Sequence, residues 1–150
     1  APVALKEIAA QVVERLQPQA ERAQIALRED VPPNLPQMLA DRDQIQTVLR
    51  NLVHNAIKFT PAGGQITVSA TARDGFVAVS VTDTGIGVPA ALHSRIFERF
   101  FKADPARTSG GTGLGLAIAR HIVAAHGGDI TVTSAQGPGS VFTFTVPIAL

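Results

Sequence analysis

Apolar residues in the first part of the chain recur every three or four positions, which is the spacing of a helix with one buried face. The residues in this pattern are Leu5, Ile8, Val12, Val13 and Leu16. We therefore predict an amphipathic helix here, with a kink near Pro18. Apolar residues also predict a helix over residues 114–125 and a short helix over residues 90–101.

The clearest helical pattern covers residues 41–59. Asp41 is the expected N-cap, with Gln44 three residues later, and Thr60-Pro61 ends the helix. One broad arc of the helical wheel is apolar and comprises Ile45, Val48, Leu49, Leu52, Val53, Ala56 and Ile57. The opposite arc carries Asn51, His54, Asn55 and Lys58. These polar residues form either a solvated face or a site where an amide oxygen holds a hard cation bridging phosphates, with the lysine balancing phosphate charge.

Alternating apolar and polar residues predict strands over residues 23–30, 65–71, 76–82, 129–134 and 141–146. The second and third of these are joined by ARDG and are expected to form a hairpin, and the last two flank the turn AQGPG. Helices mixed with half-buried strands predict an α+β fold. We expect a single domain over residues 1–150, a two-layer sandwich with helices on one face of a mixed, mostly antiparallel sheet.

Composition narrows the class of protein. The chain has 150 residues, 45% of them hydrophobic, which is enough for one domain with a real core. A net charge of +1, with interspersed charges, argues against a nucleic-acid partner. The absence of cysteine excludes disulfides and thiolate chemistry. Because no apolar run approaches the roughly 18 residues of a membrane span, we expect a cytoplasmic domain without membrane contact. The chain begins with APVALKEI, which suggests that it is a piece of a longer protein. That longer protein can be anchored in a membrane.

Residues 109–118, SGGTGLGLAI, place four glycines within six positions, at the start of a predicted helix. A helix N-terminus attracts phosphate through its unsatisfied N–H groups and positive dipole end, and glycines let the backbone approach closely. A flexible loop with tightly packed glycines is the alternative. A P-loop is excluded because Leu116-Ala117 follows the last glycine, and a dinucleotide fingerprint is excluded because an irregular polar stretch precedes it.

A second glycine-containing motif, DTGIG at residues 83–87, follows a predicted strand. Asp and Gly at this place are ordinary turn residues. Alternatively, the carboxylate of Asp83 is fixed at the strand end, and the glycines let a flat ligand lie against the backbone.

Four segments together resemble the catalytic ATP-binding domain of bacterial sensor histidine kinases, in the GHKL ATPase superfamily. NLVHNAIKFTPAGG resembles the N box of that family, DTGIGVP its first glycine box, IFERFFK its phenylalanine box, and GGTGLGLAIARHIVAAHGG its second glycine box. Each box alone is moderately specific, whereas four boxes in this order are very specific. The resemblance covers nearly the whole chain and implies a Bergerat-type ATP-binding fold.

The resemblance also implies a role for each matching residue. Asn55 would ligate Mg²⁺, Asn51 and Lys58 would help to hold phosphate, and Asp83 would accept a hydrogen bond from the adenine amino group. Gly85 and Gly87 would shape the base pocket. The second glycine box would face the triphosphate of ATP through Gly111, Thr112, Gly113, Leu114, Gly115 and Leu116.

The segment KADPARTSGGT, residues 102–112, corresponds to the mobile lid of the family. Lys102 stands where many relatives carry arginine, and the resemblance gives it a catalytic role beside Asn55. A lysine can neutralise phosphate charge, although it lacks the bidentate fork of arginine. Phe97, Phe100 and Phe101 would anchor the lid or meet the partner domain.

The resemblance implies a protein-histidine kinase that transfers the γ-phosphoryl group of ATP to a histidine on a separate dimerisation domain, with a cognate response regulator downstream. The histidines of the chain, His54, His93, His121 and His126, lack the acidic residue that follows a phosphoacceptor. We therefore expect the phosphoacceptor domain to lie outside this chain. The alternatives are an ATPase module of the gyrase, mismatch-repair or chaperone type, an anti-sigma-type serine kinase and a pseudokinase scaffold.

Overall fold

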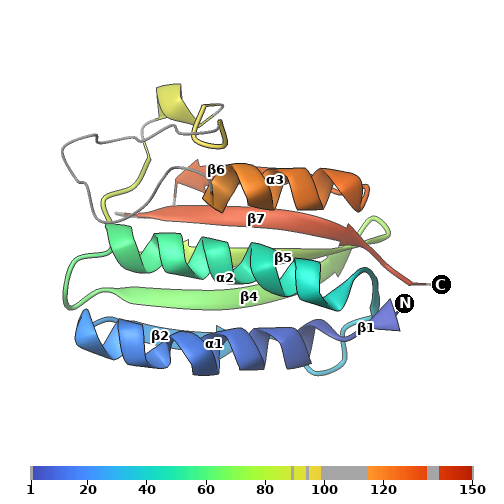
Figure 1. The fold of residues 1–150 in the computed structure, drawn as a ribbon, viewed down its shortest axis with the longest axis horizontal. Helices are drawn as coiled ribbons and strands as arrows, with labels where there is room; N and C mark the ends of the chain where they lie inside the picture. The colour runs from blue at the N-terminus through green and yellow to red at the C-terminus, as the bar shows by residue number, and fades with distance from the viewer. Residues whose placement is uncertain (1, 89, 94, 99–114, 135–138, 150) are drawn as a thin grey trace.

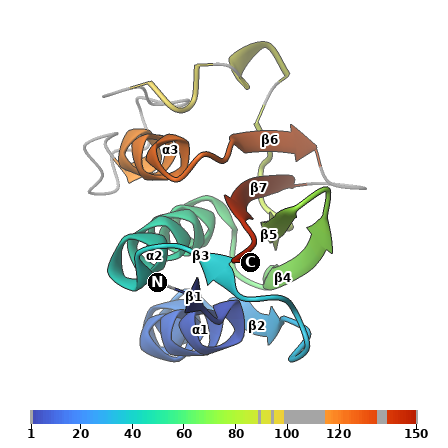
Figure 2. The same cartoon turned by 90° about the vertical axis from the view of Figure 1, so that its right-hand side faces the viewer.

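Three α-helices cover one face of a five-stranded sheet in the computed structural model, which describes residues 2–88, 90–93, 95–98, 115–134 and 139–149 (Figures 1 and 2). The helices are α1 (Leu5–Arg22), α2 (Arg42–Phe59) and α3 (Gly115–Ala125). The strands of the sheet are β2 (Ala26–Asp30), β4 (Gln65–Arg73), β5 (Phe76–Asp83), β6 (Ile130–Ser134) and β7 (Ser140–Pro147). This arrangement confirms the predicted α+β sandwich.

The sheet has the order β2-β4-β5-β7-β6. β2 pairs with β4 in parallel, and the other pairs are antiparallel, so the sheet is mixed and mostly antiparallel as predicted. The β4–β5 hairpin turns at Asp74 and Gly75, whose φ angles of 53° and 82° belong to the mirror-image turn that suits the twist of a hairpin. Two very short strands, β1 (Pro2–Val3) and β3 (Met38–Leu39), pair with each other and were not predicted, because two residues carry no periodicity.

The hydrophobic core lies between the helices and the inner face of the sheet. Strand β7 shows the alternation that builds it, because Phe142, Phe144 and Val146 are buried while the residues between them are half-buried on the other face. On α2, the predicted apolar arc is buried except for Ile57, which is half-buried against the core. The helix begins at its predicted cap, since Asp41 Oδ1 accepts a hydrogen bond from Gln44 N at 3.1 Å.

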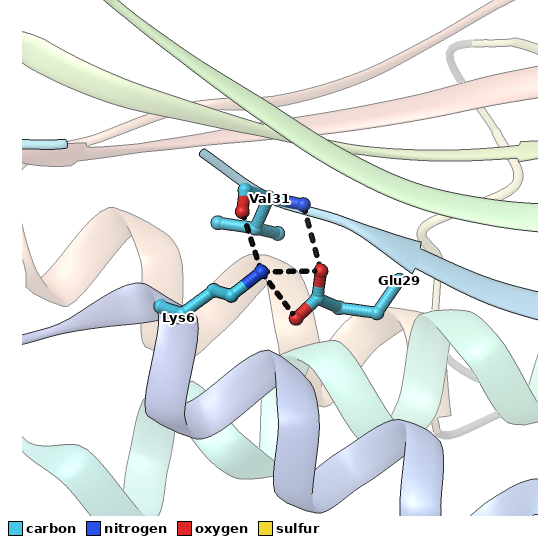
Figure 3. A network of polar contacts seen from close by, with 3 residues as sticks. All are labelled: Lys6, Glu29 and Val31. Carbon is cyan, nitrogen blue, oxygen red and sulfur yellow. Dashed lines mark hydrogen bonds and ion pairs between the residues drawn. The ribbon is translucent and has the colours of Figure 1, made fainter. Parts of the chain in front are cut away.

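A polar network ties α1 to the edge strand β2 (Figure 3). Lys6 Nζ lies 3.0 Å from Glu29 Oε2 and donates to Val31 O at 2.8 Å, while Val31 N donates to Glu29 Oε2 at 2.9 Å. Burial alone would raise the pKa of Glu29, but the Val31 amide and the Lys6 ammonium favour the carboxylate and hold this pKa below its ordinary value of 4.5. The network therefore stabilises the fold at neutral pH.

Two helical segments need comparison with the helices that the sequence predicts. Helix α1 runs through Pro18 and ends at Arg22. The short helix predicted over residues 90–101 is confirmed only at its start, because the described residues form a 3₁₀ helix, Ala90–Leu92, followed by turns. Phe97 is buried edge-on against Phe142, with ring centroids 6.0 Å apart, and tertiary contacts of this kind override a weak helical preference.

Candidate nucleotide-binding site

The polar face of α2 lies beside the first residue of α3. Asn51, Asn55 and Lys58 are half-buried on this face, and His54 is exposed. Asn51 Nδ2 donates a hydrogen bond to Gly115 O at 3.1 Å, which joins the N box to the start of the glycine-led helix. The structure therefore brings together two motifs that are more than fifty residues apart in the sequence.

Gly115 is not required by the packing of the described residues. A Cβ atom at this position would meet atoms of Asn51 at 3.8–3.9 Å, which is ordinary van der Waals contact. Close approach of a ligand to the backbone is another reason for a glycine at such a position.

Asp83 is the buried carboxylate at the end of β5, with 4% of its surface exposed. Its Oδ1 accepts hydrogen bonds from Gly85 N at 2.8 Å and from Ser140 N at 3.3 Å, and its Oδ2 accepts from Ser140 Oγ at 2.9 Å. These bonds fix the direction of the carboxylate. Oδ1 already accepts two hydrogen bonds, whereas Oδ2 accepts one and keeps a lone pair for a ligand donor.

The glycines around Asp83 allow three backbone segments to approach one another. A Cβ atom at Gly85 would lie 2.3 Å from Phe59 O, and one at Gly139 would lie 2.0 Å from Asp83 O. Gly87 has a φ of +76°, which favours glycine. The first glycine box is therefore a tightly packed turn, and its role in binding a flat ligand stays a prediction.

A backbone hydrogen bond connects the polar face of α2 with the Asp83 turn. Ile86 N donates to Phe59 O at 3.2 Å, and Phe59 is the last residue of α2. The C-terminal end of α2, the start of α3 and the end of β5 all lie on the same side of the molecule (Figure 1). Ile86 itself is 52% exposed, which places an apolar side chain on the surface of this turn.

Positive charge gathers on the exposed face of α2. His54 is exposed, but partial desolvation of its ring, followed by the nearby charges of Lys58 and Arg50, lowers its pKa. Lys58 Nζ is also 5.9 Å from the ring centroid of Phe59. Lys58 and Arg50 are the cationic side chains of this helix segment that could meet an anion.

Several predicted site residues lie outside the described residues. They are Lys102, Gly111, Thr112, Gly113 and Leu114, together with Phe100, Phe101 and the rest of the predicted lid. Leu116 is described and packs half-buried against the core. Phe97 is buried against Phe142, and its expected role, anchoring the lid or meeting the partner domain, stays a prediction.

Sequence reasoning missed Ser140, which supplies two of the hydrogen bonds to Asp83. Asp83 and Ser140 are cross-strand partners in the β5–β7 ladder. The signal was present in the closing hairpin GPGSVFTFTVP, but the register that pairs Ser140 with Asp83 depends on long-range strand pairing. It also missed His126, whose Nε2 accepts from Asp41 N at 3.1 Å and so links α3 to the start of α2.

The fold and the match to a known family define an ATPase domain. The family model of histidine kinase-, DNA gyrase B- and HSP90-like ATPases matches residues 40–150, and the chain belongs to this family. It is 42% identical over 142 residues to the sensor-like histidine kinase SenX3 of Mycobacterium tuberculosis, an alignment that covers 93% of this chain and 34% of SenX3. It is 47% identical over 111 residues to the sensor histidine kinase WalK of Bacillus subtilis, which covers 71% of this chain and 18% of WalK.

Solved structures give the same family. Full-length ShkA in complex with AMPPNP has a TM-score of 0.88 and 40% identity, over 99% of this chain and 31% of ShkA. Histidine kinase ThkA in complex with the response regulator TrrA has a TM-score of 0.83 and 30% identity, over 99% of this chain and 42% of ThkA. The chain thus spans about a third or less of the curated relatives named above. Among the helices that the structure describes, none combines the length and apolar character that crossing a membrane requires.

Proposed function

We propose that the chain is the catalytic domain of a sensor histidine kinase, acting as one unit over residues 1–150. It binds Mg²⁺-ATP and presents the γ-phosphoryl group to a histidine on a separate dimerisation domain. The observation that carries this proposal is the junction of the buried Asp83 turn with the amide-bearing face of α2 through the Ile86–Phe59 hydrogen bond. The named relatives and the AMPPNP complex of ShkA support it.

Asp83 would recognise the base. An ionised carboxylate accepts hydrogen bonds only, so it pairs with the adenine amino group and repels the carbonyl oxygen that guanine carries at the same position. The three internal hydrogen bonds hold the carboxylate in place before the ligand arrives. Gly85 and Gly87 would shape the base pocket by letting the turn pack closely against Phe59 O and Gly139 O.

Asn55 would hold Mg²⁺. Within the described residues no group of three or more His, Cys, Asp or Glu side chains could hold a metal ion. A magnesium ion bound mainly by substrate phosphates and water needs few protein ligands, and the amide oxygen of Asn55 is a hard donor of the kind it prefers. The donor set of α2 therefore fits a metal that arrives with the triphosphate.

Asn51, Lys58 and the second glycine box would hold the phosphates. Lys58 supplies positive charge, and the start of α3 supplies N–H groups and the positive end of the helix dipole. Gly111, Thr112, Gly113, Leu114, Gly115 and Leu116 belong to this part of the proposal, and Lys102 would add charge from the lid. Phosphoryl transfer depends largely on positioning and charge stabilisation, which these groups can provide.

The nucleophile would come from another domain, because none of the four histidines of this chain has the sequence of a phosphoacceptor. We propose two protein partners, the dimerisation domain of the same kinase and a cognate response regulator. The complex of ThkA with TrrA, a response regulator, supports the second partner. We place this activity in the cytoplasm, where ATP is available.

Calorimetric titration of ATP, with and without Mg²⁺, tests the proposal. Wild type should bind ATP more tightly with Mg²⁺, and Asn55→Ala should lose this dependence while remaining folded, because Asn55 lies outside the core. The matched control is Asn34→Ala in the exposed connector before β3, which should bind like wild type. An unchanged dependence on Mg²⁺ in Asn55→Ala would contradict the metal assignment.

A further inference from the structure

Thr60 directly follows the last residue of α2, and the environment of its hydroxyl group is unusual. The residue is 6% exposed, and its Oγ1 atom is buried without a hydrogen-bond partner among the described residues. Leaving a buried hydroxyl unpaired costs free energy, and most buried polar groups in proteins are paired. The Thr60 hydroxyl therefore lacks, in this conformation, the hydrogen-bond partner that a buried polar group normally has.

Thr60 lies next to the turn that follows Asp83. The segments on either side of it are joined by three hydrogen bonds, from Ile86 N to Phe59 O, from Thr84 N to Gln65 O and from Gln65 N to Thr84 Oγ1. A Cβ atom placed at Gly64 would touch both Thr60 Cγ2, at 2.3 Å, and Thr84 Oγ1, at 2.9 Å. The methyl group of Thr60 and the hydroxyl of Thr84 thus lie on either side of the same point beside Gly64.

Thr84 offers a suitable acceptor. Its hydroxyl oxygen accepts one hydrogen bond, from Gln65 N at 2.9 Å, and a hydroxyl oxygen has two lone pairs. Thr84 is also the residue that follows Asp83, so a ligand bound at Asp83 would lie close to this hydroxyl.

We propose that Thr60 is a positioning residue for the turn of residues 83–87, and that its hydroxyl gains Thr84 Oγ1 as a partner when a nucleotide base binds beside this turn. The inference rests on the proposed function, since it assumes that a base binds at Asp83. The free energy of the new hydrogen bond then contributes to nucleotide affinity. Because the bond forms at the base end of the site, the contribution is the same for ADP and ATP.

The test uses Thr60→Val, which keeps the shape of the side chain and removes the hydroxyl, and Thr60→Ser, which keeps the hydroxyl. Thr82→Val is the matched control, a half-buried threonine of β5 whose neighbours Val81 and Asp83 point to the opposite face. The measurements are the melting temperature of each nucleotide-free protein and its Kd for ADP by calorimetry.

Thr60→Val should melt at or above the wild-type temperature, because it removes an unpaired hydroxyl, and should bind ADP about three- to ten-fold more weakly. Thr60→Ser and Thr82→Val should bind like wild type. An unchanged Kd in Thr60→Val, or a lowered melting temperature, would overturn the inference, since the hydroxyl would then be idle or already paired. If wild type itself fails to bind ADP, the proposed function fails, and the inference fails with it.

Discussion

Replacing Asp83 by asparagine changes the charge of the candidate base-binding group while preserving its shape. The amide oxygen can take over the hydrogen bonds that Oδ1 accepts from Gly85 N and Ser140 N. The amide nitrogen then faces Ser140 Oγ, which can turn to accept instead of donate. The fold should therefore survive, whereas alanine at this position would leave all three donors unpaired.

The effect on affinity follows from the hydrogen bond that the carboxylate would offer to a base. A hydrogen bond to a charged group contributes about 1.5–3 kcal/mol, which corresponds to about a ten- to 150-fold change in Kd. Asparagine presents an N–H donor where Asp83 Oδ2 presented a free lone pair, so Asp83→Asn should weaken ATP binding by up to this amount. The same donor suits the carbonyl oxygen of guanine, so the preference for ATP over GTP should narrow.

Calorimetric titration of ATP and GTP into wild type, Asp83→Asn and Ser140→Ala separates this effect from a general loss of structure. Ser140→Ala removes one donor to Oδ2 and keeps the charge, so it should lower the free energy of unfolding by about 1 kcal/mol and leave the base preference intact. If Asp83→Asn remained folded and kept both the wild-type affinity for ATP and the wild-type ratio of ATP to GTP affinity, Asp83 would not be a base-binding residue.

Two further predictions concern the glycine boxes and the α1–β2 network. Gly85→Ala should lower the free energy of unfolding by about 1–3 kcal/mol in urea titrations, because its Cβ would lie 2.3 Å from Phe59 O. Gly115→Ala should leave folding intact and weaken ATP binding. If Gly85→Ala kept the wild-type stability and Gly115→Ala kept the wild-type affinity for ATP, the roles assigned to the two glycines would be wrong. Glu29→Gln should destabilise the chain by about 1 kcal/mol at pH 7. This difference should shrink as the pH falls below 4.5, because the lowered pKa of Glu29 stabilises the fold only while the carboxylate is ionised, and a constant difference would contradict the network.

The elements of the fold could be predicted where the hydrophobic period was long and uninterrupted. The arc on α2 and the alternation of β7 are of this kind, and so is the N-cap at Asp41. The order of the sheet could not be predicted, because strand order depends on contacts between distant segments. The extent of the helix beyond Leu92 could not be predicted for the same reason, since Phe97 packs against Phe142, which is distant in the sequence.

The motifs of the candidate site could be predicted from the sequence, but the contacts between their residues could not. Asn55 and Asp83 were identified from the sequence, and the roles assigned to them remain predictions. The hydrogen bond between Asn51 and Gly115 and the support of Asp83 by Ser140 emerge only when separate elements pack together. Thr60 carried no signal at all, because a threonine after a helix is ordinary until its hydroxyl proves to be buried and unpaired.

Transfer of labelled phosphate tests the central claim most directly. The chain is incubated with Mg²⁺ and γ-labelled ATP, first alone and then with a dimerisation domain from its own parent kinase. The account predicts no acid-labile label on the chain alone and label on a histidine of the added domain, with transfer lost in Asn55→Ala. Label on one of the chain's own histidines, or phosphate release without any labelled histidine on the added domain, would contradict it.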